Sequence, residues 1–304
     1  GFVQGIAMTT IQDKLQGSMV ALVTPMHSNG DVDWQSLANL IDWQIEQGTD
    51  VLVSVGTTGE SATLSMQEHA DVIEFTMKQV AGRIPVIAGT GANNTVEAIE
   101  LTQHAKQAGA DAVLLVVPYY NKPTQEGLYL HYKAIAEAVD IPQVLYNVPG
   151  RTIVDMQQAT VERLADIDNI IAIKDATGDV VRGAKLIEAV KGRMTVFSGD
   201  DATALELMRH GAKGNISVTA NVAPKAMSQI FNLALQGDFE QAASINQKIA
   251  HLHADLFVES SPIPAKYALY KMGQIEQGIR LPLTWLSAAH QPMIDDALIK
   301  AGLL

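Results

Sequence analysis

Cysteine is absent from the 304 residues of this chain. Its absence excludes disulfide bonds, a thiol nucleophile and metal sites built on thiolates. No apolar run approaches the roughly 20 residues that a membrane-spanning helix needs. Basic residues are also scarce, because 21 lysines and arginines stand against 33 aspartates and glutamates, a net charge of −12. We therefore expect neither nucleic acid nor an anionic membrane surface as a partner.

Apolar residues are abundant at 47%, whereas charged residues make up 18%. This balance supplies a large core and argues against disorder, and the length suits a single α/β barrel. The first ten residues, GFVQGIAMTT, lack the basic start and long apolar stretch of a secretory signal. We expect a cytoplasmic protein in which Met8 is the natural initiator and residues 1–7 are not native.

Short apolar runs alternate with amphipathic helical patterns through most of the chain. Eight runs have the length and composition of buried strands: residues 19–23, 51–55, 85–88, 112–117, 143–147, 170–174, 195–198 and 214–218. The stretches 35–47, 67–80 and 126–138 carry apolar residues at helical spacing. Such an alternation predicts a parallel sheet with right-handed crossovers.

Eight β-α units fit a closed (β/α)8 TIM barrel better than an open doubly wound sheet. From residue 238 onwards the pattern is purely helical, over 238–256, 263–273 and 290–302. We predict three parts: an N-terminal segment over 1–16, the barrel over 17–237 and a C-terminal helical extension over 238–304.

Polar and aromatic residues gather directly after the predicted strands. From the second strand to the eighth, the strand ends read VGTTGES, AGTGANN, VVPYYNKP, LYNVPGRT, IKDATG, SGDD and ISVTAN. In a TIM barrel the active site lies at this rim, where strands end and the following loops begin. We therefore expect the functional residues in these loops.

Lys174 ends the apolar run of NIIAIKDATG, residues 169–178. Burial disfavours the ammonium ion, and a neutral amine can attack a carbonyl carbon. Taken alone, Lys174 is better explained by a strand end that reaches water or by an ion pair with Asp175. Tyr146 ends the preceding strand, so its phenol can lie beside Lys174 and carry protons, or it is an ordinary interior tyrosine.

Two further groups on the predicted rim suit anionic ligands. Thr57 and Thr58 lie between glycines in GTTGES, where hydroxyls and backbone amides can hold a carboxylate. Arg151 follows a Pro-Gly turn, and its planar guanidinium suits bidentate capture of a carboxylate. The alternatives are a turn without a ligand and a surface ion pair.

Two other patterns are weak. GTGANN, residues 89–94, resembles the start of a dinucleotide-binding fingerprint, but Asn94 replaces the third glycine. His251 and His253 are two residues apart in a predicted helix, so they point to different faces and make a poor metal site.

Taken together, VGTTGES, PYYN, LYNVPGRT and IIAIKDATG resemble the class I, Schiff-base-forming pyruvate aldolases of the N-acetylneuraminate lyase superfamily. Within it the resemblance is closest to the dihydrodipicolinate synthase family, from about residue 17 to residue 304. The synthases carry a PxRT sequence around the position of Arg151, and the sialic acid lyases do not.

The resemblance implies a lyase that condenses pyruvate with L-aspartate 4-semialdehyde, the first committed step towards diaminopimelate and lysine. It implies no metal and no organic cofactor. Lys174 would form the imine with pyruvate, and Tyr146 would shuttle protons. Thr57 would connect Tyr146 to Tyr120, which a neighbouring subunit lends to the site.

The resemblance also assigns the groups that hold the substrates. Thr58 would bind the carboxylate of pyruvate, and Arg151 would bind the carboxylate of the semialdehyde. The backbone carbonyls of Gly199 and Ile216 would help to place the substrate and the lysine.

A homotetramer, built as a dimer of dimers, and feedback inhibition by L-lysine are further implications of the resemblance. Glu97 would pair with the ammonium group of the effector and Tyr119 with its carboxylate. Met66 stands where an inhibited relative has a histidine, which bears on the strength of inhibition. The effector would lie at the dimer interface among Ser61, Ala62, His69, Asn93, Glu97 and Tyr119.

Two rival functions stay open. Another class I pyruvate aldolase, acting on N-acetylneuraminate or a 2-keto-3-deoxy sugar, would use the same lysine and tyrosine. A non-catalytic barrel that binds lysine or pyruvate is the other rival, and it would not need Lys174, Tyr146, Thr57 and Tyr120 together.

Overall fold

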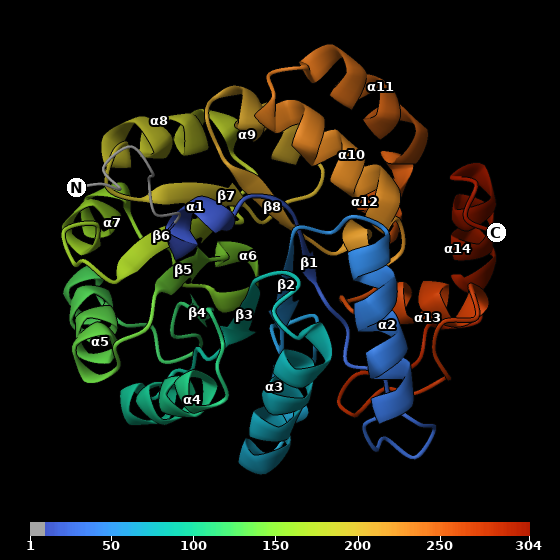
Figure 1. The fold of residues 1–304 in the computed structure, drawn as a ribbon, viewed down its shortest axis with the longest axis horizontal. Coiled ribbons are helices and arrows are strands. Elements are labelled where there is room, and N and C mark those ends of the chain that lie inside the picture. Colours follow the sequence, from blue (N-terminus) through green and yellow to red (C-terminus); the bar gives the residue numbers. More distant parts are fainter. Residues whose placement is uncertain (1–9) are drawn as a thin grey trace, which may run out of the picture.

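A closed barrel of eight parallel strands forms the centre of the molecule. The computed structural model describes residues 10–304, so the predicted initiator Met8 and residues 1–7 lie outside the described residues. Figure 1 shows the strands in the middle and the helices around them, which confirms the predicted (β/α)8 barrel. The strands follow one another in chain order, and the last pairs with the first: β1 (Gly17–Ala21), β2 (Val51–Ser54), β3 (Val86–Gly89), β4 (Ala112–Val116), β5 (Gln143–Asn147), β6 (Ile170–Asp175), β7 (Thr195–Ser198) and β8 (Gly214–Ser217).

Helices connect successive strands and cover the outside of the barrel (Figure 1). They are α2 (Trp34–Glu46), α3 (Met66–Val80), α4 (Thr95–Gln107), α5 (Gln125–Ala138), α7 (Gln158–Leu164), α8 (Val180–Val190), α9 (Ala204–Arg209) and α10 (Pro224–Leu235). The short α6 (Pro149–Thr152) follows β5 and lies inside this ring of helices. The single turns η1 (Ser61–Thr63) and η2 (Thr219–Asn221) follow β2 and β8. The start of α3 is fixed by a capping box, in which Ser65 and Glu68 each accept a hydrogen bond from the backbone amide of the other.

Strands β5 and β7 have the predicted bounds, the other six differ by one or two residues, and two of these differences have a visible cause. Strand β1 begins at Gly17 and ends at Ala21, not at Val23, because the amide of Val23 donates to the side-chain oxygen of Asn221 at 3.1 Å. Strand β8 ends one residue early, because the amide of Val218 donates to the carboxylate of Asp201 at 3.1 Å. In both places the backbone amide donates to a side chain that is distant in the sequence, and not to the neighbouring strand.

The barrel has an inner core and an outer core, because successive strand residues point to opposite sides. The inner core includes Met19, Phe197 and Ile216, all at most 2% exposed. The short helix α1 (Ile11–Lys14) lies across the opening in Figure 1. Leu15 directly after it joins the inner core, so this end of the barrel is closed and the strand ends at the other rim carry the loops.

The C-terminal part is helical, as predicted. It contains α11 (Phe239–Ile249), α12 (His251–Asp255), α13 (Ile263–Lys271) and α14 (Gln291–Lys300), which lie outside the barrel ring in Figure 1. The single helix expected over 238–256 is wrong, since α11 and α12 meet at Ala250. The amide of His253 donates to the carbonyl of Ala250 at 3.1 Å, a three-residue bond that interrupts the regular ladder. Within residues 10–304, none of the helices is apolar and long enough to traverse a membrane.

Candidate active site

Lys174 and Tyr146 lie side by side at the mouth of the barrel. They are partners in the register of β6 and β5, so both side chains point to the same side of the sheet. Each residue is 7% exposed, and Nζ of Lys174 lies 3.9 Å from the centre of the Tyr146 ring. This is the juxtaposition that the sequence predicts.

The simpler explanations of Lys174 do not hold. The side chain does not reach water freely, because the residue is buried. Asp175 does not pair with it either, since one carboxylate oxygen of Asp175 accepts from the amide of Thr177 at 2.8 Å. In the part of the chain that the structure describes, Lys174 has no ion-pair partner. A buried amine without a counter-charge is available for chemistry.

Gly199 directly follows β7, and because it has no side chain, Lys174 can occupy the space beside it. A β-carbon at this position would lie 2.7 Å from Cε and 2.9 Å from Cγ of Lys174, closer than real contacts allow. The amide of Gly199 donates to the carbonyl of Asp175 at 2.8 Å, which ties the two strand ends together. Ile216 on β8 is 2% exposed and belongs to the same inner core as Tyr146. Of these two predicted positions, Gly199 lies directly against the lysine.

A cavity of about 430 Å³ opens at this rim. It contains Thr57, Tyr146 and Arg151 of the predicted catalytic and substrate-binding residues. Thr58 is buried beside it, and Asn93 donates to the carbonyl of Tyr119 at 3.0 Å; neither lines the cavity. The lining also includes Met66 and the predicted effector residues Ser61, Ala62, His69, Glu97 and Tyr119. The two predicted sites are thus neighbouring parts of one hollow.

Charge is distributed unevenly within this hollow. Arg151 is exposed and uses one amino group to donate to the carbonyl of Ser261 at 3.2 Å. Burial lowers the pKa of His69, whose Nε2 lies 2.7 Å from the carbonyl of Gly89. Burial and the nearby charge of Glu97 raise the pKa of Tyr119, which keeps its phenol protonated. Arg151 therefore brings a positive charge to the lining of the cavity, Glu97 brings a carboxylate, and His69 and Tyr119 bring neutral groups.

Tyr120 is a predicted site residue that does not line the cavity of its own chain. It is 87% exposed and has a φ of +76°, a conformation that residues other than glycine rarely adopt. Its neighbour Tyr119 turns inwards and lines the cavity. The two adjacent tyrosines thus point in different directions, one into the chain's own site and one away from it.

Sequence reasoning missed a buried ion pair beneath the GTTGES turn. Glu60 is 4% exposed and Lys266 on α13 is 0% exposed, and the carboxylate contacts the amine. The same amine donates to the carbonyl of Gly278 at 2.9 Å. The available signal was a lysine at the centre of IPAKYAL, a stretch whose other residues are all apolar or aromatic.

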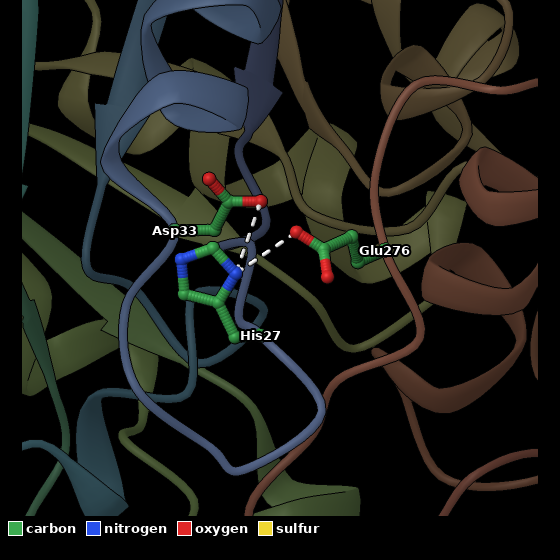
Figure 2. A group of neighbouring side chains, drawn as sticks. All are labelled: His27, Asp33 and Glu276. Carbon is green, nitrogen blue, oxygen red and sulfur yellow. Dashed lines mark hydrogen bonds and ion pairs between the residues drawn. The ribbon is translucent and has the colours of Figure 1, made fainter.

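A separate group of titratable side chains joins the loop after β1 to the segment after α13. Figure 2 shows Nδ1 of His27 facing two carboxylates, 2.9 Å from Glu276 and 3.9 Å from Asp33. Donor atoms of these types can bind a cation. However, Asp33 caps α2 by accepting from the amide and hydroxyl of Ser36, and Glu276 is exposed. A helix cap and a surface ion pair account for all the contacts.

The two C-terminal histidines have unrelated partners. Nε2 of His251 lies 2.9 Å from the carbonyl of Ala297. His253 is buried between the hydroxyl of Thr219 and the side chain of Asn246, each 2.9 Å from a ring nitrogen.

Comparison with known proteins agrees with this geometry. The model of the dihydrodipicolinate synthetase family matches residues 14–301. A 4-hydroxy-tetrahydrodipicolinate synthase of Psychrobacter arcticus is 68% identical over 98% of this chain and 99% of its own length. The homologous protein of Pseudomonas putida W619, with the same name, is 62% identical over 95% of this chain and 99% of its own length.

Solved structures give the same result. The chloride-inhibited dihydrodipicolinate synthase of Acinetobacter baumannii, complexed with pyruvate, superimposes with a TM-score of 0.95 at 61% identity. The match covers 95% of this chain and 100% of that one. The enzyme of Cyanidioschyzon merolae, solved with lysine bound, gives 0.91 at 39% identity over 95% and 99% of the two chains. The chain belongs to the dihydrodipicolinate synthetase family.

Proposed function

We propose that this protein is a lyase that condenses pyruvate with L-aspartate 4-semialdehyde to form 4-hydroxy-tetrahydrodipicolinate. The observation that carries the proposal is the contact between the amine of Lys174 and the ring of Tyr146 at the barrel mouth. Relatives at 62–68% identity over nearly the whole chain carry the name of this synthase. The reaction belongs to lysine biosynthesis, and we place it in the cytoplasm.

Lys174 acts as the nucleophile in this proposal. Its amine adds to the keto carbon of pyruvate, and loss of water gives an imine. The protonated imine withdraws electrons, so that the methyl group can release a proton and become an enamine carbon. That carbon attacks the aldehyde carbon of the semialdehyde, a new carbon–carbon bond forms, and the aldehyde oxygen takes up a proton to become the hydroxyl group. The amino group of the semialdehyde then adds to the imine carbon and expels the amine of Lys174, which closes the ring and frees the enzyme. Tyr146 is close enough to carry protons between these groups.

Different side chains bind the carboxylates of the two substrates. Thr57 and Thr58 lie on the turn after β2, where hydroxyls and amides suit the carboxylate of pyruvate. Arg151 lies across the cavity on α6 and suits the carboxylate of the semialdehyde. The carbonyls of Gly199 and Ile216 help to orient the lysine and its substrate. Two cations within an otherwise acidic protein make the site attractive to two anions.

Assembly and regulation extend the proposal. An exposed Tyr120 held at positive φ suits insertion into the site of a second copy, where it would connect to Thr57. We propose a homotetramer that shares this residue in pairs. L-lysine would bind in the outer part of the cavity, with its ammonium group on Glu97 and its carboxylate near Tyr119. Met66 lines this part and offers no charge, so inhibition would be weak.

One assay tests the chemistry. The protein is incubated with pyruvate, reduced with borohydride and digested, and we expect a three-carbon unit on Lys174 by mass spectrometry. A coupled assay with pyruvate and the semialdehyde then gives the turnover, with and without L-lysine. Labelling at another residue, or none, would refute the imine. Faster turnover with N-acetylmannosamine, the aldehyde partner of a sialic acid lyase, would favour the rival aldolase.

Mixing variants tests the shared residue. Tyr120→Phe should reduce turnover while the cavity of each chain stays intact. When it is mixed with Lys174→Ala under conditions that exchange subunits, some sites regain all residues and activity should partly return. Exchange without any recovery would show that each subunit is self-sufficient.

A further inference from the structure

The turn that carries Thr57 and Thr58 has an uncommon backbone conformation. Val55 just before it has a φ of +50°, and Glu60 at its end has a φ of +59°. Such values are rare for residues with side chains and persist only where the surroundings enforce them. Within the turn, the amide of Glu60 donates to the carbonyl of Thr57 at 3.0 Å. The amides of Gly59 and Ser61 also donate to the carbonyl of Gly56, at 3.1 and 3.3 Å. From outside the turn, the hydroxyl of Thr24 donates to the carbonyl of Gly59 at 2.8 Å, and further outside contacts reach Glu60.

The side chain of Glu60 supplies the strongest outside contact. It does not line the cavity, and both of its oxygens are engaged by the C-terminal part of the chain. One oxygen contacts the buried amine of Lys266, and the other accepts from the amide of Arg280 at 3.2 Å. The lysine in turn donates to Gly278. The end of the turn is therefore fastened to α13 and to the segment that follows it.

Arg280 fastens the residues on the far side of the turn. Its guanidinium donates to the carbonyl of Thr63 at 2.9 Å and to that of Gly30 at 2.8 Å, and it pairs with Glu68 at 2.6 Å. Gly278 brings this segment into direct contact with the loop after β1, since a β-carbon there would lie 2.1 Å from a carbonyl oxygen of that loop. The contacts on both sides of the turn thus originate from residues 266–280.

A buried ion pair needs a reason beyond stability. Removing two charges from water costs about as much as their attraction returns, and apolar residues of similar size often serve equally well. What a charged pair adds is a defined geometry, because a buried carboxylate must lie against the amine. The position of the Lys266 amine therefore determines the position of Glu60 and of the turn after β2.

We propose that Lys266 is a positioning residue for the reaction: through Glu60 it fixes the turn whose Thr57 and Thr58 receive the carboxylate of pyruvate. The inference rests on the proposed function of these threonines. It assigns a role to the C-terminal extension, which supplies the lysine from outside the barrel. Binding of pyruvate should depend on this pair, whereas binding of the semialdehyde at Arg151 should not.

The double variant Glu60→Gln/Lys266→Met of the full chain provides the test, because it leaves no unpaired buried charge. The measured quantity is the pyruvate concentration that gives half-maximal borohydride trapping at Lys174. Misplacing a binding group by about 1 Å costs up to about a hundredfold, and we expect an increase of about tenfold or more. The KM of the semialdehyde should change less than about twofold, because Arg151 contacts the C-terminal part only through the carbonyl of Ser261 and touches neither Glu60 nor Lys266. Lys271→Met, an exposed lysine on the same helix, is the matched control and should behave as the unmodified protein.

The outcomes separate this inference from the proposed function. Absence of trapping in the unmodified protein would overturn both. Normal half-saturation by pyruvate in a folded double variant would overturn the positioning role alone, and so would an equal rise in both substrate constants. If the double variant does not fold, Glu60→Asp alone decides, since its carboxylate keeps the charge opposite Lys266 but is one methylene shorter and so shifts the turn; an unchanged pyruvate dependence there would refute the inference.

Discussion

Two lysines of this protein are buried, and their surroundings differ. Lys174 ends β6 at the barrel mouth, rests on the ring of Tyr146 and has no ion-pair partner within residues 10–304. Lys266 lies on α13, fully buried, in contact with the carboxylate of Glu60 and the carbonyl of Gly278. The amine of Lys266 thus has an ion-pair partner and a hydrogen-bond acceptor, whereas the amine of Lys174 has no ion-pair partner.

The comparison shows that burial does not by itself mark a catalytic lysine. The amine of Lys266 is engaged by the carboxylate of Glu60 and the carbonyl of Gly278, so it cannot approach a substrate carbonyl. The amine of Lys174 has no such partner and lies beside a phenol at the barrel mouth, where a carbonyl carbon can reach it. The charge of the neighbouring group therefore distinguishes the two roles, and substitutions at the two positions should have opposite consequences for activity and stability.

The largest expected effect comes from Lys174→Met. Turnover should fall by about ten thousandfold or more, because the nucleophile is lost. The free energy of unfolding should change by less than about 1 kcal/mol, since no charged partner is left behind. A coupled rate assay and urea unfolding measure the two quantities. A large loss of stability would mean that Lys174 also has a structural role, so that the two buried lysines would not differ in the way described.

Unlike Lys174→Met, the variant Lys266→Met should strongly lower the free energy of unfolding. Removing one member of a buried ion pair costs about 3–5 kcal/mol, because Glu60 would remain as an uncompensated charge. Adding Glu60→Gln should restore most of this loss, and Lys271→Met should stay within about 0.5 kcal/mol of the unmodified protein. Urea unfolding of the four proteins measures the effect. Equal stability of the single and double variants would show that the charge of Glu60 is not the cause.

A smaller effect is expected from the pair that flanks the same turn. Arg280 lowers the pKa of Glu68 from 4.5 to about 2. A lowered carboxyl pKa adds stability above pH 4.5, which is lost as the pH falls towards 2. Because Glu68 is partly exposed, we expect about 1–2 kcal/mol after allowance for solvent screening. Unfolding of the unmodified protein at pH 5 and pH 3 should show this loss, and Glu68→Gln should lack that part of it.

The smallest effect is expected at the surface cluster of Figure 2. His27→Ala removes an exposed ion pair with Glu276 and leaves the cap of α2 in place. Such pairs contribute about 0–1 kcal/mol. Urea unfolding at pH 6 and 8 should therefore give nearly the values of the unmodified protein. A loss of stability as large as that of Lys266→Met would mean that the exposed pair His27–Glu276 stabilises the protein as much as the buried pair Glu60–Lys266 does.

Much of the fold could be read from the sequence, because buried parallel strands and amphipathic helices have distinct local patterns. The bounds of β5 and β7 agree with the prediction residue for residue. The ends of β1 and β8 do not, because Asn221 and Asp201 bind backbone groups there from distant parts of the chain. No local pattern contains that information.

The same limit applies to the candidate site. Lys174 and Tyr146 could be placed together because each ends a strand and neighbouring strands of a barrel share a rim. Lys266 could not be linked to Glu60, since the two lie near opposite ends of the chain and only the packing of α13 joins them. The different placement of Tyr119 and Tyr120 came only from the family resemblance, because no local pattern distinguishes two adjacent tyrosines.

Gly199 has a consequence for anyone who redesigns this barrel to accept other keto acids. The cavity wall offers many positions where a smaller or larger side chain can be tried. Position 199 is different, because even the methyl group of alanine would lie 2.7 Å from Cε of Lys174. A library that varies this glycine would displace the nucleophile before it altered selectivity, so the residue should be held constant while the loops after β2 and β5 are varied.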